Sequence, residues 1–326
     1  MDNPPHKKDE YAHTRARACS SRMEREDELE FCVDTKSRGY SSNSQPGNSI
    51  SVFSYTNEQW FEEMGKLRDL LEPEVGASDQ LKIAIIDTGL NVNQDVIRSQ
   101  IEFRDFVEPE NTGLKDGDRH GTEMFMTIRE VMREVSKNVE FLVARAWETQ
   151  KIPSERPKYL QLVSRITEAI TWVGSRKVDI ILMSWGFGDD EPRIRSAIEG
   201  IPGKPLIAVA SGNFGASERV LFPARMELDG AAVTAVFSAT SFNKNSRQLN
   251  HLPLQGGNNF AILGEDVMFR DPTNPAVVVK GKKLTGTSVA AAIFAGFAGF
   301  LLLFARCELS DRDDGRLRET DTGKKA

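Results

Sequence analysis

The chain alternates short apolar runs with longer stretches in which apolar residues recur at helical spacing. Five of the short runs predict buried strands, because each is rich in Val, Ile, Leu or Ala and ends near a polar or Gly-containing turn. These runs cover residues 81–86, 139–146, 178–183, 205–210 and 232–239. Strands that alternate with helices are typical of a mostly parallel sheet with helices on both faces, so we predict an α/β fold.

Apolar residues at a helical period predict four helices. One covers about 57–72, a second begins at His120, and a third covers 162–173. The fourth follows Gly286 as the uninterrupted apolar or Gly run Val289–Ala305. This run is at the low edge of the length that crosses a membrane. We therefore expect a buried core helix in preference to a membrane span.

Both ends of the chain are polar. Residues 1–56 are rich in charge, Ser, Asn and Pro, and we expect most of an N-terminal extension, residues 1–80, to be disordered apart from its one helix. Residues 308–326 form a charged C-terminal tail. A single folded domain is therefore expected over residues 81–307.

The composition excludes some classes of partner and compartment. The 326 residues are 39% hydrophobic, enough for a large core, and carry a net charge of -6, which argues against non-specific nucleic-acid binding. Three cysteines give no disulfide framework, and the first twenty residues contain no apolar segment of the kind that forms a secretory signal. We expect a cytoplasmic protein with no nucleic-acid or membrane partner, no cofactor and no metal site.

Five polar positions are expected to meet at one edge of the sheet. Asp87 follows the first strand, Ser184 to Gly186 the third, and Asn213 the fourth. Parallel strands present their carboxyl ends at one rim, where ligands of such sheets bind. Helices that follow strands begin at the same rim, which brings His120 and Ser288 there. Each position alone has an ordinary explanation as a turn or helix-capping residue.

The residue types at this rim suit acyl transfer. A serine hydroxyl at the start of a helix, here Ser288, becomes a nucleophile when a base takes its proton. His120 is a candidate base, and Asp87 is a candidate partner that fixes the imidazole tautomer. Asn213 and the Ser288 N–H are candidate donors to a developing oxyanion. The alternative that Thr287 or Ser288 is only an N-cap remains open.

Six ordered motifs resemble those of the subtilisin-like serine proteases, the subtilases. They are IAIIDTG ending at residue 89, HGT at 120, MSWG at 183, ASGN at 210, FPA at 222 and GTSVAA at 286. The resemblance covers about residues 81–307. It implies a subtilisin-like three-layer sandwich with a mostly parallel central sheet, and a serine endopeptidase with Asp87, His120 and Ser288 as its triad and Asn213 in its oxyanion hole.

The resemblance also implies where a peptide or protein substrate binds. It would lie as an added strand beside two short segments of backbone. Trp185 is bulkier than the residue usual in the family, and we expect its side chain to narrow the substrate groove. The alternative function is a recognition module of a larger assembly that keeps the groove without efficient turnover. The predicted substrate-binding residues are Ser184, Trp185, Gly186, Ala210, Ser211 and Gly212.

Overall fold

The computed structural model describes the central domain and one helix before it. The described residues are 57–71, 80–92, 99–213, 220–226, 232–239, 259–271 and 274–321. The disorder expected for residues 1–56 lies outside them. The helices are α2 (Asn57–Leu71), α4 (His120–Met132), η1 (Arg133–Asn138, a 3₁₀ helix), α5 (Arg156–Gly174), α6 (Pro192–Glu199) and α7 (Thr287–Asp321). The strands are β1 (Leu81–Asp87), β2 (Ile101–Asp105), β3 (Val139–Arg145), β4 (Ile180–Met183), β5 (Leu206–Ala210), β6 (Ala232–Ala239), β7 (Asn259–Leu263), β8 (Val267–Asp271) and β9 (Asn274–Leu284).

A seven-stranded sheet forms the centre of the protein. Its strand order is β2-β3-β1-β4-β5-β6-β7, and every neighbouring pair is parallel. The five predicted strands are β1, β3, β4, β5 and β6, which confirms the expected parallel sheet. β2 and β7, which the apolar pattern did not predict, add the two edges.

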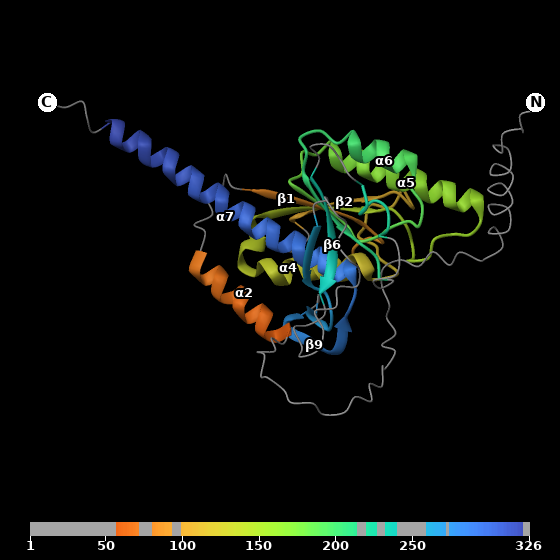
Figure 1. Cartoon of the computed structure of the whole chain (residues 1–326), viewed down its shortest axis with the longest axis horizontal. Coiled ribbons are helices and arrows are strands. Elements are labelled where there is room, and N and C mark those ends of the chain that lie inside the picture. Colours follow the sequence, from red (N-terminus) through yellow and green to blue (C-terminus); the bar gives the residue numbers. More distant parts are fainter. Residues whose placement is uncertain are drawn as a thin grey trace, which may run out of the picture.

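Helices cover both faces of this sheet, giving three layers (Figure 1). The fully buried side chains of Ile83 and Ile85 in β1 belong to the core shared with α4 and α7. Ala84 and Ile86 belong to the core on the opposite face, shared with α5 and α6. Apart from the half-buried Lys82, every residue of Leu81–Ile86 is apolar and fully buried, because both faces of this strand are covered.

The apolar helix predicted after Gly286 is α7, and it lies against the sheet and α4. The segment Thr287–Cys307 has a mean hydropathy of 2.2, long and apolar enough to cross a membrane, yet 67% of it is buried inside the protein. Close packing against α4 explains the glycine at position 296, because a Cβ there would lie 3.0 Å from Val131 Cβ. The helix continues to Asp321, beyond the predicted apolar run.

The turn into α7 is sharp because of its glycine. β8 and β9 pair as an antiparallel ribbon outside the main sheet, and β9 leads directly to this turn. Gly286 has φ 140°, a conformation that L side chains rarely adopt, and its N–H donates to Gly264 O at 2.7 Å. The turn therefore fixes where Thr287 and Ser288 begin the helix.

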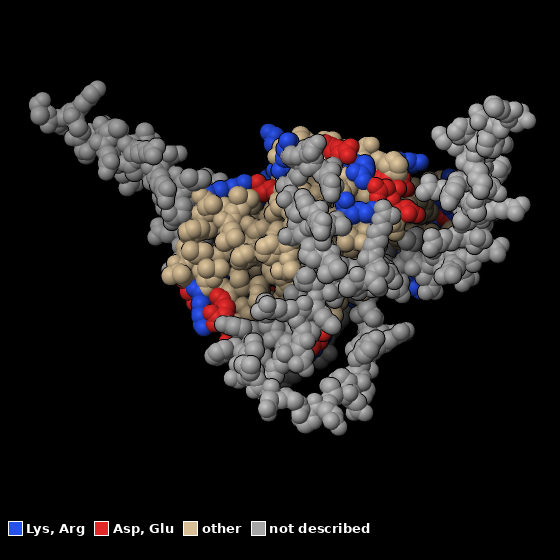
Figure 2. All heavy atoms as spheres, viewed as in Figure 1, with Lys and Arg blue, Asp and Glu red and all other residues tan. Residues whose placement is uncertain are grey.

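On the face shown in Figure 2, basic and acidic side chains are interspersed, and the remaining described surface is uncharged. Ion pairs such as Arg195–Asp190 and Lys158–Glu155 join groups of opposite sign on the α5 and α6 side. Exposed pairs of this kind contribute little to stability, about 0–1 kcal/mol each.

Candidate active site

The carboxyl ends of three neighbouring strands and the starts of two helices form the predicted rim. β1 ends at Asp87, while Ser184 follows β4 and Asn213 lies three residues after β5. Because β1, β4 and β5 are adjacent in the sheet, these positions adjoin. α4 begins at His120, and Ser288 is the second residue of α7.

Asp87 and His120 are joined by a short hydrogen bond in a buried setting. Asp87 Oδ1 lies 2.7 Å from His120 Nδ1, and the two side chains are 0% and 2% exposed. The backbone N–H of Thr88 also donates to Asp87 Oδ1, at 2.7 Å. With Nδ1 engaged, Nε2 is the remaining ring nitrogen, and it is buried with no hydrogen-bond partner among the described residues.

The environment shifts the pKa values of both members of this pair. Burial raises the pKa of the Asp87 carboxyl above its ordinary value, although the charge of His120 and its hydrogen bond act in the opposite direction. Burial lowers the pKa of His120, but the Asp87 carboxylate more than offsets this, so the net shift of the imidazole is upward. Asp118 and Glu123 also raise the pKa of His120.

Ser288 is held by Ser184 rather than by the imidazole. Ser288 Oγ donates to Ser184 O at 3.1 Å, and Ser184 Oγ donates to Ser288 O at 3.3 Å, with both residues buried. Among the described residues no hydrogen bond reaches His120 Nε2. The structure therefore brings Asp87 and His120 into direct contact, whereas no hydrogen bond joins Ser288 Oγ to His120 Nε2.

Asn213 is anchored to the start of α7. Its Oδ1 accepts from Thr287 N at 2.8 Å and from Thr287 Oγ1 at 3.1 Å. Thr287 Oγ1 in turn accepts from Gly212 N at 3.1 Å. Asn213 thus satisfies the first N–H of the helix, a donor that has no partner within the helix itself. These bonds do not use the two N–H donors of the Asn213 amide.

The two predicted substrate-binding segments are tied to their neighbours. Ser184 O accepts from Ser288 Oγ, as described above. Ser211 O accepts from Leu221 N at 3.0 Å. Next to Gly186, Phe187 and Phe222 form an antiparallel bridge, with N–H to O distances of 2.7 and 3.0 Å. A Cβ on Gly186 would lie 2.6 Å from Leu221 Cβ, so this position has no room for a side chain. Ala210 ends β5 and is fully buried.

The prediction that Trp185 narrows the groove is wrong. Its side chain is 1% exposed, and its Nε1 donates to Ile86 O at 3.0 Å. The indole packs edge-on against Trp147 and Phe187, with ring centroids 5.9 and 5.8 Å away. The side chain thus points into the core beside α5 and α6, where its N–H has the partner that a buried indole requires.

The sequence interpretation did not select the polar residues that support this rim. Thr88, Asp116 and Thr122 are buried and hydrogen-bond around the positions that were selected. The available signal was local: a hydroxyl residue directly follows Asp87, another lies two residues after His120, and an aspartate lies four residues before it. Within the described residues, no group of three or more His, Cys, Asp or Glu could hold a metal ion.

Similarity to known proteins bears on this arrangement. Residues 78–313 match the model of the subtilase family. The chain is 25% identical over 230 residues to the major intracellular serine protease of Bacillus subtilis (strain 168), covering 66% of each protein. It superposes on fervidolysin from Fervidobacterium pennivorans, a keratinolytic enzyme related to subtilisin, with a TM-score of 0.54 and 16% identity, over 74% of this chain and 39% of that one. It also superposes on a cold-adapted subtilisin-like serine proteinase with a TM-score of 0.50 and 23% identity, over 68% of this chain and 75% of that one. With well over half of its length matched by the family model, the chain belongs to the subtilase family of serine peptidases.

Proposed function

We propose that the chain hydrolyses peptide bonds as a serine endopeptidase, through an acyl-enzyme formed on Ser288. The observation that carries the proposal is the buried Asp87–His120 hydrogen bond of 2.7 Å at the rim where α7 presents Ser288. A histidine whose Nδ1 is held by a carboxylate has its tautomer fixed, so that Nε2 can accept a proton. Membership of the subtilase family supports the same chemistry.

In the proposed reaction, Ser288 Oγ attacks the carbonyl carbon of the scissile bond and His120 Nε2 takes its proton. The Asn213 amide N–H and the Ser288 backbone N–H donate to the oxyanion that develops. His120 then returns the proton to the leaving amine, which breaks the C–N bond. Water, activated by the same imidazole, hydrolyses the ester and restores Ser288.

Attack requires Ser288 Oγ to exchange one hydrogen bond for another. It now donates to Ser184 O, and the mechanism needs it to donate to His120 Nε2. A peptide paired with the Ser184–Gly186 segment would bring a backbone N–H to the Ser184 carbonyl and release the serine hydroxyl. Catalytic hydrogen bonds that are long or absent without substrate commonly form only in the substrate complex.

The proposed substrates are peptides or proteins in an extended conformation, bound by backbone pairing along Ser184–Gly186 and Ala210–Gly212. The relative from Bacillus subtilis is described as intracellular. That description supports a cytoplasmic location for this chain as well.

Labelling with a fluorophosphonate probe tests the proposal, because an activated serine displaces the fluoride of the probe far faster than an ordinary serine does. We expect one adduct on the full-length protein, located by peptide mass spectrometry at Ser288, and none on Ser288→Ala. Ser164→Ala is the matched control, since Ser164 lies on the exposed side of α5 with its hydroxyl bonded to Glu168.

Hydrolysis of an unstructured protein such as casein should follow the same pattern. The wild type and Ser164→Ala are expected to cleave it, and Ser288→Ala is expected to be inactive. A wild-type protein that is folded by circular dichroism, yet neither labels nor cleaves, would contradict the proposal and favour a binding role.

A further inference from the structure

Asp116 is a buried carboxylate that takes no part in the proposed reaction. It lies in the loop before α4 and is 5% exposed. Its Oδ1 accepts from Thr88 Oγ1 at 2.9 Å and from Arg119 N at 2.8 Å. Its Oδ2 accepts from Thr122 N at 2.9 Å and from Thr122 Oγ1 at 2.6 Å. Four donors therefore converge on the two oxygens of one side chain.

The two threonine hydroxyls that donate to Asp116 also accept backbone N–H groups. In each case the N–H comes from the other of the two segments, the turn after β1 or the start of α4. Thr88 Oγ1, in the turn after β1, accepts from Gly121 N of α4 at 2.9 Å. Thr122 Oγ1, in α4, accepts from Asn91 N of the turn at 3.0 Å. The carboxylate thus binds together the segment that carries Asp87 and the helix start that carries His120.

Close backbone contact leaves this junction little freedom. A Cβ on Gly89 would collide with Lys115 O, and one on Gly121 would collide with Gly89 O. Leu90 N donates to Lys115 O at 3.1 Å, which ties the turn to the residue before Asp116. The helix has no side-chain cap from Arg119, and Asp116 instead accepts the N–H of Thr122 in its first turn.

We propose that Asp116 is a positioning residue, which holds the α4 start against the β1 turn so that His120 keeps its hydrogen bond to Asp87. The inference rests on the proposed function for its kinetic meaning, although the bracing itself is a property of the fold. A shift of about 1 Å in a catalytic group can cost on the order of 10²-fold in rate. The effect of losing Asp116 should therefore appear in kcat, since Asp116 touches neither the serine nor the predicted substrate segments.

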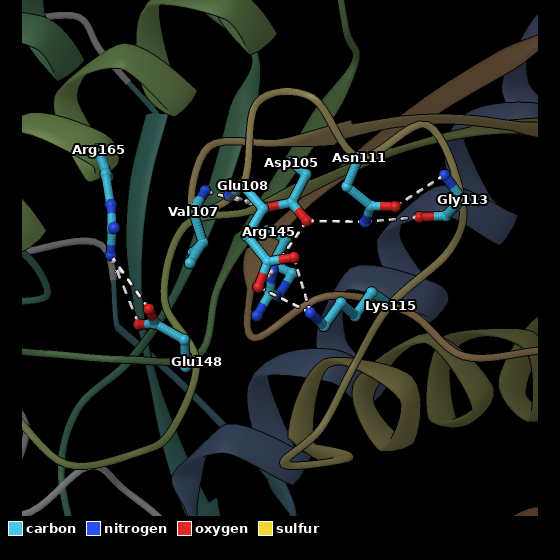
Figure 3. A network of polar contacts seen from close by, with 9 residues as sticks. All are labelled: Asp105, Val107, Glu108, Asn111, Gly113, Lys115, Arg145, Glu148 and Arg165. Carbon is cyan, nitrogen blue, oxygen red and sulfur yellow. Dashed lines mark hydrogen bonds and ion pairs between the residues drawn. The ribbon is translucent and has the colours of Figure 1, made fainter.

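The matched control is Asp105, a second buried aspartate at the other end of the same loop. Its Oδ1 accepts from Val107 N and Glu108 N, each at 2.9 Å. Its Oδ2 accepts from Asn111 Nδ2 at 2.9 Å and Arg145 Nη1 at 2.8 Å, as Figure 3 shows. Asp105 therefore has as many donors as Asp116, but none of them comes from α4.

The experiment compares Asp116→Asn with Asp105→Asn in the full-length protein. An amide has one acceptor oxygen, so both variants lose acceptor capacity and both should unfold at a lower temperature. Only Asp116→Asn should lower kcat, by about 10- to 10²-fold with KM within about twofold. The acid limb of its pH–rate profile, the pH range in which kcat/KM falls on acidification, should also move to lower pH. The reason is that His120 loses part of the contact with Asp87 that raises its pKa. The other charged groups that raise the pKa of His120, Asp118 and Glu123, are unchanged in this variant.

A second pair of variants covers the case in which Asp116→Asn does not fold. Thr122→Val removes one hydroxyl that links Asp116 to Asn91, whereas Thr122→Ser keeps it. We expect Thr122→Val to lower kcat several-fold with the same shift of the acid limb, and Thr122→Ser to stay close to the wild type. A loss of stability alone would lower the active fraction in both without moving the limb.

The outcomes separate this inference from the proposed function. If the wild type cleaves peptides and Asp116→Asn matches Asp105→Asn in kcat and in its acid limb, the positioning role is overturned and the peptidase proposal stands. If the wild type does not cleave, the peptidase proposal fails and the NMR signal of the His120 ring N–H decides the positioning role. That proton should exchange with water faster in Asp116→Asn than in Asp105→Asn, and equal exchange would overturn the inference.

Discussion

The two halves of the rim are held in different ways. On one side, Asp87 and His120 contact each other directly, and the turn and helix that carry them are joined through Asp116. On the other, Ser288 and Asn213 are each bound to supporting residues, Ser184 and Thr287. The base and its orienting carboxylate are thus already paired, whereas the candidate nucleophile has its hydrogen bond elsewhere. In the proposed mechanism, the contact that substrate must complete is the one between Ser288 Oγ and His120 Nε2.

Asp87→Asn should have the largest effect, because it acts on the half that is already assembled. The amide keeps the shape of the carboxylate but favours the wrong imidazole tautomer and cannot stabilise the imidazolium. A loss of about 10⁴-fold in kcat is the scale known for this substitution in serine proteases. Steady-state hydrolysis of a chromogenic peptide measures it. A loss of less than tenfold would contradict the assigned role of Asp87.

Asn213→Ala should have the next largest effect, on the less assembled half. It removes one of the two proposed donors to the oxyanion and should lower kcat by about 10²–10³-fold, the scale reported for the oxyanion asparagine of subtilisin. KM should change little, because the interaction strengthens only as charge develops on the oxygen. An unchanged kcat in this variant would move the oxyanion site away from Asn213.

The pH dependence joins the two halves, since in the proposed mechanism His120 must be neutral to take the proton of Ser288. Its pKa is raised above 6.5 by the Asp87 carboxylate, so kcat/KM should fall as the pH drops through a value above 6.5. Below that pKa the loss is about tenfold per pH unit. A pH profile with an acid limb below 6.5 would show that another group controls the rate.

The free energy of unfolding should fall with rising pH over the range in which kcat/KM rises. The folded protein binds a proton at His120 more tightly than the unfolded chain does, so the stabilisation is full below pH 6.5 and is lost as the pH rises through the folded-state pKa. Thermal unfolding of Ser288→Ala, which cannot digest itself, should therefore show a melting temperature that declines over this range. His120→Gln should remove that decline.

The strands and helices around the site could be predicted from the sequence because an element that is buried on more than one face has apolar residues at nearly every position. Leu81–Ile86, which only Lys82 interrupts, and the apolar start of α7 are of this kind. β2 could not be found in this way, since Ile101–Asp105 is an edge strand whose side chains are mostly half-buried and include Glu102 and Arg104. Its place follows from pairing with β3, a contact between residues distant along the chain.

Side-chain direction within the site was harder to predict than position. The order of Asp87, His120 and Ser288 suggested that they meet, but no sequence pattern indicated that Ser288 Oγ would donate to Ser184 O. The direction of the Trp185 side chain was wrongly predicted for a related reason. Its size suggested an obstacle in the groove, whereas the indole points into the core and its N–H donates to Ile86 O. Asp116 has no periodic pattern around it, and its role depends on hydrogen bonds from two other segments.

Thr287→Val should have the smallest effect on kcat. It tests how the Ser288 and Asn213 side of the rim is held. Valine keeps the shape of threonine but removes the hydroxyl that donates to Asn213 Oδ1 and accepts from Gly212 N, while Thr287 N still holds the amide. The bond to Asn213 Oδ1 is the one of these two that holds the proposed oxyanion donor, and losing one neutral hydrogen bond costs about 1 kcal/mol, so kcat should fall about fivefold. Of the two bonds of the hydroxyl only the one to Asn213 reaches a proposed oxyanion donor, so the same substitution in the Asn213→Ala background should lower kcat by much less than fivefold. A further fivefold loss in that background would mean that Thr287 acts on the reaction independently of Asn213.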